Sequence, residues 1–222
     1  MDWVLITKTA LMSFQKGVND WIVASRVQGG WVQGPNAALT PGSLKGVADL
    51  EPRVLNGMMS GGVPPAVAKA IAQELCGAWL EWANGFAMSL PGAYPKLGAV
   101  PGPAAPPTPA AQPYPLSRGS SAGEMRLQKA TLATRLSTAI KPYAGRDVAG
   151  LEQAVQIVAE WVDGSFRDWK MAAQVVGVMG KGPVPTFAPP YVPVGPVVMG
   201  DNISAPGGIA AIAGPRFGKP VR

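Results

Sequence analysis

Residues 148–176 read VAGLEQAVQIVAEWVDGSFRDWKMAAQVV, and their apolar positions recur at alternating spacings of three and four residues. The stripe consists of Val148, Leu151, Val155, Val158, Val162, Phe166, Trp169, Ala173 and Val176. This period gives an α-helix one apolar face, and Asp147 is the expected N-cap. Residues 2–28, 63–90 and 122–140 carry similar stripes, and a short helix broken near Pro52 is expected within residues 43–59. We therefore predict a mainly α fold.

Two long segments rich in proline and glycine interrupt this pattern. Nine prolines fall within residues 91–115, and nine more within residues 177–222. Proline breaks helix interiors and central strands, so both segments are expected to be extended arms, and residues 31–46 to be loop. The expected organisation is a helical region 1–90, a Pro-rich connector 91–121, a second helical region 122–176 and an extended C-terminal arm 177–222.

Five of the seven tryptophans directly follow a carboxylate, whereas chance placement would give roughly 0.4 such pairs. The pairs are Asp2-Trp3, Asp20-Trp21, Glu81-Trp82, Glu160-Trp161 and Asp168-Trp169. Neighbouring side chains on a helix lie about 100° apart, so the indole can be buried while the acid faces water. The alternative is that these carboxylates bind Arg or Lys of neighbouring subunits.

A degenerate internal repeat is suggested by aligning Trp21 with Trp169. The identical pairs are Asp20/Asp168, Trp21/Trp169, Ala24/Ala172, Gly29/Gly177, Gly34/Gly182 and Pro35/Pro183. A second comparison, of residues 67–101 with residues 148–185, places Trp161 rather than Trp169 in register. The alternative is that biased composition and helices ending in Gly-Pro produce these matches.

The residue types in the sequence give little support for catalysis or metal binding. The chain has no histidine, which removes His-based acid–base catalysis and most zinc sites. Residues 119–123, GSSAG, match a G-x-S-x-G motif with Ser121 in the nucleophile position, but no strand precedes it and we expect a flexible loop. The single cysteine, Cys76, lies in an apolar run and is expected to be buried. We predict no enzyme activity, no cofactor and no metal.

Composition points instead to contacts with other proteins. Only 14% of residues are charged, although the formal net charge is +6. The basic residues do not cluster, which argues against nucleic acid as a partner. No run is long enough for a transmembrane helix, and residues 1–12 lack the features of a secretory signal.

An amphipathic helix ending in an aromatic residue and followed by a Val/Pro/Gly-rich arm occurs twice. The first is Val67–Phe86 with Gly98-Ala-Val-Pro101, and the second is Val148–Trp169 with Gly182-Pro-Val-Pro185. This pattern resembles small accessory structural proteins of tailed bacteriophage virions. The resemblance implies a non-enzymatic component of the capsid, neck, tail or baseplate, assembled in the host cytoplasm.

The function predicted from these features is a structural subunit that links neighbouring subunits through its Pro-rich arms. Its expected partners are other virion proteins and copies of itself in a symmetric assembly. The candidate interaction residues are Trp21, Trp82, Trp169, Phe187, Tyr191, Val194 and Val197. The alternative is an adaptor or scaffold of a cellular complex associated with a membrane or with nucleic acid.

Overall fold

The fold is known from a computed structural model, which describes residues 1–95, 100–101, 104–145, 147–183, 194–195, 197–204 and 212–219. Within these residues there are five α-helices. They are α1 (Trp3–Val23), α2 (Leu50–Ser60), α3 (Pro65–Gly85), α4 (Lys129–Ile140) and α5 (Val148–Ala172), with short 3-10 turns η2 (Leu116–Arg118), η3 (Ala122–Leu127) and η4 (Lys141–Tyr143). The mainly α prediction is confirmed at this level.

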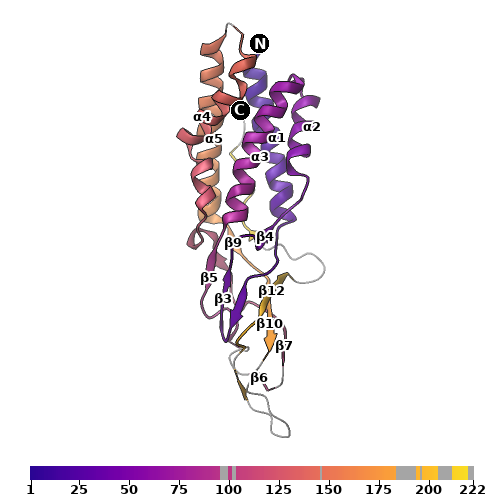
Figure 1. The fold of residues 1–222 in the computed structure, drawn as a ribbon, viewed down its shortest axis with the longest axis vertical. Helices are drawn as coiled ribbons and strands as arrows, with labels where there is room; N and C mark the ends of the chain where they lie inside the picture. The colour runs from indigo at the N-terminus through magenta and orange to yellow at the C-terminus, as the bar shows by residue number, and fades with distance from the viewer. Residues whose placement is uncertain are drawn as a thin grey trace.

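The helices form a bundle at one end of the molecule, and most of the strands lie beyond it at the other end (Figure 1). Helix α3 packs against α1, α2 and α4, and α5 closes the bundle against α1 and α4. Helices α1, α3 and α5 each end where the chain enters a strand. The bundle therefore presents its helix ends, rather than its sides, to the strands.

Local sequence explains where the helices begin. The Asp147 carboxylate accepts a hydrogen bond from the Gly150 N–H at 3.0 Å, which confirms the predicted N-cap of α5. Asp2 caps α1 in the same way through the Leu5 N–H. Pro52 does not break a helix as expected, because α2 begins at Leu50 and places Pro52 in its first turn, where a missing N–H costs no hydrogen bond.

The strands are short and make five small antiparallel sheets among the described residues. One sheet pairs β1 (Arg26–Val27) with β4 (Leu44–Lys45), and another has the order β2 (Trp31–Gln33), β3 (Asn36–Leu39), β5 (Met88–Leu90). A third has the order β12 (Asp201–Ser204), β10 (Val178–Pro183), β7 (Ala104–Pro109). The last two are β11 (Val194–Gly195) with β6 (Val100–Pro101), and β13 (Ile212–Ala213), β9 (Gln174–Val175), β8 (Tyr114–Pro115). We call β2, β3, β5–β7 and β10–β12, together with the adjoining residues 91–95 and 197–200, the β-extension.

Several expectations for the proline-rich and loop regions were wrong. Residues 31–46 are not simply loop, because β2 and β3 form a hairpin around Gly34 and Pro35 and β4 follows. The connector 91–121 and the arm 177–222 are not free extensions either, because their described parts pair with each other, as β10 does with β7. The prolines of β7 are tolerated because β7 is an edge strand of its sheet.

The end of α1 and the end of α5 lead into the same order of elements. Helix α1 is followed by the two-residue strand β1, by Gly29 at φ 90° and by β2. Helix α5 is followed by the two-residue strand β9, by Gly177 at φ 62° and by β10. Only glycine adopts these left-handed angles readily, so both glycines turn the chain from the bundle towards the β-extension.

Candidate interaction surfaces

The three tryptophans predicted as interaction residues meet in the core, where α1, α3 and α5 end. Trp21, Trp82 and Trp169 are all buried, and the Trp82 ring centroid lies 6.4 Å from that of Trp21 and 5.7 Å from that of Trp169. Trp79 lies between them, within 5.5 Å of all three ring centroids. We call Trp21, Trp79, Trp82, Phe166, Trp169 and Phe217 the aromatic cluster. While the bundle is intact its tryptophans cannot touch a partner, so their predicted role in interaction needs correction.

The carboxylates beside the tryptophans face outward and have partners in their own chain. Asp20 pairs with Lys16 at 3.0 Å, Glu160 with Lys129 at 2.7 Å and Asp168 with Lys219 at 2.9 Å. Glu81 pairs with Arg126, and Asp2 caps α1. The interpretation of a buried indole beside a solvent-facing acid holds for Trp3, Trp21, Trp82 and Trp169, whereas Trp161 is half-buried. The five acids do not need Arg or Lys from a neighbouring subunit.

The C-terminal segment, residues 212–219, is fixed to the bundle by Phe217. Its ring is fully buried, and its centroid lies 5.2 Å from that of Trp79 and 6.0 Å from that of Phe14. The Phe217 N–H donates to Asn19 Oδ1 at 2.9 Å, and the Asn19 side-chain amide donates back to the Phe217 carbonyl at 3.1 Å. This part of the predicted arm packs on its own chain, between α1 and α5.

The G-x-S-x-G motif has a packing role. The Ser121 hydroxyl accepts a hydrogen bond from the Gly123 N–H and caps η3, so the expected flexible loop is a 3-10 turn. A Cβ on Gly119 would lie 2.2 Å from the Phe86 ring, and one on Gly123 would lie 2.5 Å from the Glu81 backbone. Both glycines are therefore needed for η3 to approach α3 closely.

The described residues offer little that could hold a cofactor or a metal. They contain no group of three His, Cys, Asp or Glu side chains that could bind a metal ion. Cys76 is buried as predicted, and desolvation raises the pKa of its thiol well above the usual range. Among the parts of the chain described here, no helix has both the length and the apolar character needed to cross a membrane.

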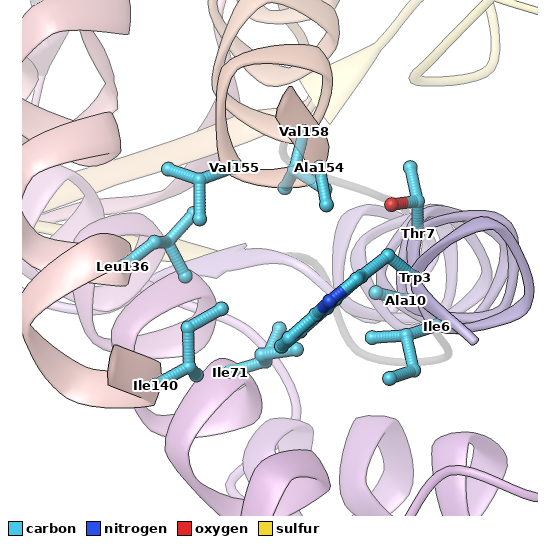
Figure 2. A pocket seen from close by; sticks show the side chains of 10 residues that line it. All are labelled: Trp3, Ile6, Thr7, Ala10, Ile71, Leu136, Ile140, Ala154, Val155 and Val158. Carbon is cyan, nitrogen blue, oxygen red and sulfur yellow. The ribbon is translucent and has the colours of Figure 1, made fainter. Parts of the chain in front are cut away.

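A small void lies at the opposite end of the bundle from the aromatic cluster. Figure 2 shows the Trp3 indole reaching from α1 into the space between Ile71, Ile140 and Val155. The void has a volume of about 10 Å³, barely that of one water molecule, and its lining is almost entirely apolar. It is a packing gap and cannot hold a small-molecule ligand.

An open apolar groove lies next to this void, on the outside of the bundle between the first turns of α1 and α5. We call it the α1/α5 groove; its volume is about 540 Å³. Its exposed apolar side chains are Met1, Val4 and Ile157, and Val4 is 80% exposed. Asp2 and Asp147 border it but already cap helices, so Lys8 is the charged side chain of the lining that caps no helix. The groove therefore suits an uncharged apolar partner.

The β-extension carries a second set of exposed apolar side chains. The Val32 N–H donates to the Gly200 carbonyl at 3.0 Å, which places residues 197–200 beside β2. Trp31 in β2 is 44% exposed, and Met199 is 76% exposed. Exposed tryptophan and methionine are typical of protein interfaces.

Two of the remaining candidate residues, Val194 and Val197, are described in this region. Val197 is fully buried, next to Gly182 of β10, so it stabilises the extension rather than contacting a partner. Val194 belongs to β11, which pairs with β6. Phe187 and Tyr191 lie outside the described residues.

Comparison with known proteins identified no relative of this chain. No family model matches the chain, and neither the curated proteins nor the solved structures gave a match.

Sequence reasoning missed Phe217, Trp31 and the α1/α5 groove. Phe217 is a single apolar residue between Arg216 and Gly218, with no periodicity to mark it. Trp31 could have been noticed, because it is one of the two tryptophans without a preceding acid, and the other, Trp79, is at the centre of the aromatic cluster. The groove depends on how α1 meets α5, which no local pattern encodes.

Proposed function

We propose that this protein is a non-enzymatic structural subunit of a virus or phage particle, which links neighbouring subunits through apolar, proline-rich surfaces. The observation that carries the proposal is the location of its exposed apolar side chains. One group, Met1, Val4 and Ile157, lines the α1/α5 groove at the helical end, and Trp31 and Met199 are exposed at the β-extension, at the other end of the molecule (Figure 1). An elongated chain with apolar surfaces at both ends suits a link between two neighbours.

The packing of the bundle supports the same proposal. The aromatic cluster and the acids beside the tryptophans find partners within the chain, so the bundle is a self-sufficient scaffold. Low charge and exposed Val, Met and Trp side chains are unfavourable in a free monomer. Burial against other subunits removes that disadvantage.

We also infer a degenerate internal duplication that includes the ends of α1 and α5. The aligned residues Gly29 and Gly177 both have positive φ, and the two-residue strands β1 and β9 fall at equivalent positions. Trp21 and Trp169 both enter the aromatic cluster. A duplicated unit that sends an apolar strand out of a helical core suits a protein that joins subunits.

The direct test is the identification by mass spectrometry of proteins that copurify with the native chain. Capsid, portal, sheath or baseplate proteins in fixed stoichiometry are expected. A native chain recovered alone, or bound to anionic liposomes in a salt-sensitive manner, would instead favour the membrane-associated adaptor.

Protease protection gives an independent readout. Residues 184–193 contain no Lys or Arg but include Phe187 and Tyr191, which are chymotrypsin sites. The proposal expects cleavage there in the isolated protein and protection in the particle. Equal cleavage in both states would contradict a role of this segment in joining subunits.

A further inference from the structure

The C-terminal segment, residues 212–219, packs between α1 and α5. The Gln15 amide donates to the Phe217 carbonyl at 3.2 Å, and the Lys219 N–H donates to Ser165 Oγ at 3.4 Å. The α1/α5 groove lies between the same two helices, nearer to their first turns. The packing of residues 212–219 shows that the surface between α1 and α5 accepts an extended, glycine- and proline-containing segment.

The α1/α5 groove has the apolar character of a protein interface. Val4 is 80% exposed and Ile157 is 47% exposed on its two sides, and Leu11 closes its floor. Its two carboxylates, Asp2 and Asp147, accept backbone hydrogen bonds as helix caps, and Lys8 is the basic side chain of its lining. The segment that completes it should be apolar, uncharged and poor in backbone donors.

We propose that the α1/α5 groove binds residues 184–193 of a second copy of this chain, so that copies associate head to tail. This inference rests on the proposed structural role, and it identifies the partner and the two surfaces that meet. It differs from the general proposal because it requires self-association rather than contact with any virion protein.

The sequence of the segment matches the chemistry of the groove. Residues 184–193 read VPTFAPPYVP, with four prolines, two aromatic residues and no charge. Proline donates no hydrogen bond, so the segment can lie on an apolar surface without leaving many N–H groups unpaired. Phe187 and Tyr191 supply the large side chains that anchor interfaces.

The partner must be another molecule because of where the segment leaves the fold. It connects Pro183, the end of β10, to Val194, the start of β11, and β11 pairs with β6. Figure 1 shows β10 and β6 in the part of the molecule away from the helices, whereas the groove lies at the first turns of α1 and α5. A contact between different surfaces on two copies is heterologous, and it extends into a chain or closes into a ring.

Two single variants and their mixture test this proposal. Ile157→Glu places a charge in the groove, and Phe187→Glu places one in the segment. Met171→Glu is the matched control, because Met171 is also an exposed apolar residue of α5 but does not line the groove. Masses are measured by sedimentation velocity over a concentration series, and far-UV circular dichroism confirms folding.

The expected result is that the wild-type chain and Met171→Glu form oligomers that grow with concentration. Each of the other two variants should need at least about tenfold more protein to associate. An equimolar mixture of Ile157→Glu and Phe187→Glu should form heterodimers that grow no further, since it retains one intact groove and one intact segment. This complementation is specific to head-to-tail contact.

Association of Ile157→Glu at the wild-type concentration would overturn the proposal, and so would a mixture of the two variants that stays monomeric. A wild-type chain that stays monomeric throughout would also overturn it. In that case, copurification with capsid or baseplate proteins would still support the proposed function, so the two failures can be told apart.

Discussion

The bundle and the β-extension are held together by different kinds of interaction. In the bundle, the ends of α1, α3 and α5 bring four tryptophans into one cluster, together with Phe166 and Phe217. In the β-extension, strands of two to six residues are joined by backbone ladders around a few apolar side chains such as Val32 and Val197. The bundle is therefore stabilised mainly by side chains and the extension mainly by hydrogen bonds between backbones.

The side chains that stabilise the fold therefore differ from those that we expect to contact partners. Large side chains in the bundle cluster are buried, whereas Trp31 and Met199 of the extension are exposed. Substitutions in the cluster should unfold the protein, and substitutions of exposed residues in the extension should leave it folded.

The largest effect is expected for Trp79→Ala. Its ring contacts five other aromatic rings, so the substitution should lower the free energy of unfolding by about 3–5 kcal/mol. Urea denaturation followed by circular dichroism measures this change. Trp31→Ala is the control from the extension and should change the stability little; a loss equal to that of Trp79→Ala would show that the two regions do not differ in this way.

Phe217→Ala should cost about 3 kcal/mol, because the C-terminal segment loses its only buried aromatic side chain among the described residues. The loss should also be local, with faster amide hydrogen exchange in residues 212–219. Lys219→Ala removes only the exposed ion pair with Asp168 and serves as the control. If exchange in the segment were unchanged in Phe217→Ala, Phe217 would not be its anchor.

Tyr94→Phe should cost about 1 kcal/mol within the extension. The Tyr94 hydroxyl donates to the Val178 carbonyl at 2.9 Å, and burial raises the pKa of this side chain above its usual range. The measurement is again urea denaturation, with Tyr143→Phe as the exposed control. An unchanged free energy of unfolding would mean that this hydrogen bond does not stabilise the start of β10.

The smallest effect concerns pH. A hydrogen bond from Lys129 and the charge of its ammonium lower the pKa of Glu160. The resulting stabilisation is present above the pKa of an unfolded glutamate, about 4.3, and is lost as the pH falls through the lower folded value. Glu160→Gln should therefore differ slightly from wild type at neutral pH and converge with it in acid. An NMR titration that places the Glu160 pKa at or above the unfolded value would contradict this.

The sequence was informative where a side-chain pattern extended over many residues. The apolar stripe of residues 148–176 and Asp147 predicted α5 and its cap, although α5 ends at Ala172 and the last residues of the stripe lead into β9. The acid–Trp pairs predicted buried indoles with solvent-facing acids, as found for four of the five pairs. It was uninformative for strands of two residues such as β1 and β9, because their pairing depends on segments far away in the chain. The α1/α5 groove was missed for the same reason, since residues some 150 positions apart line it.

Hydrogen exchange of the isolated chain, compared with the chain in its native assembly, tests the central claim most directly. We predict that assembly slows exchange in the first turns of α1 and in residues 184–193, while the peptides that contain Trp79 and Trp169 exchange equally slowly in both states. Equal exchange of the groove and of residues 184–193 in both states would contradict the claim that these apolar surfaces join subunits.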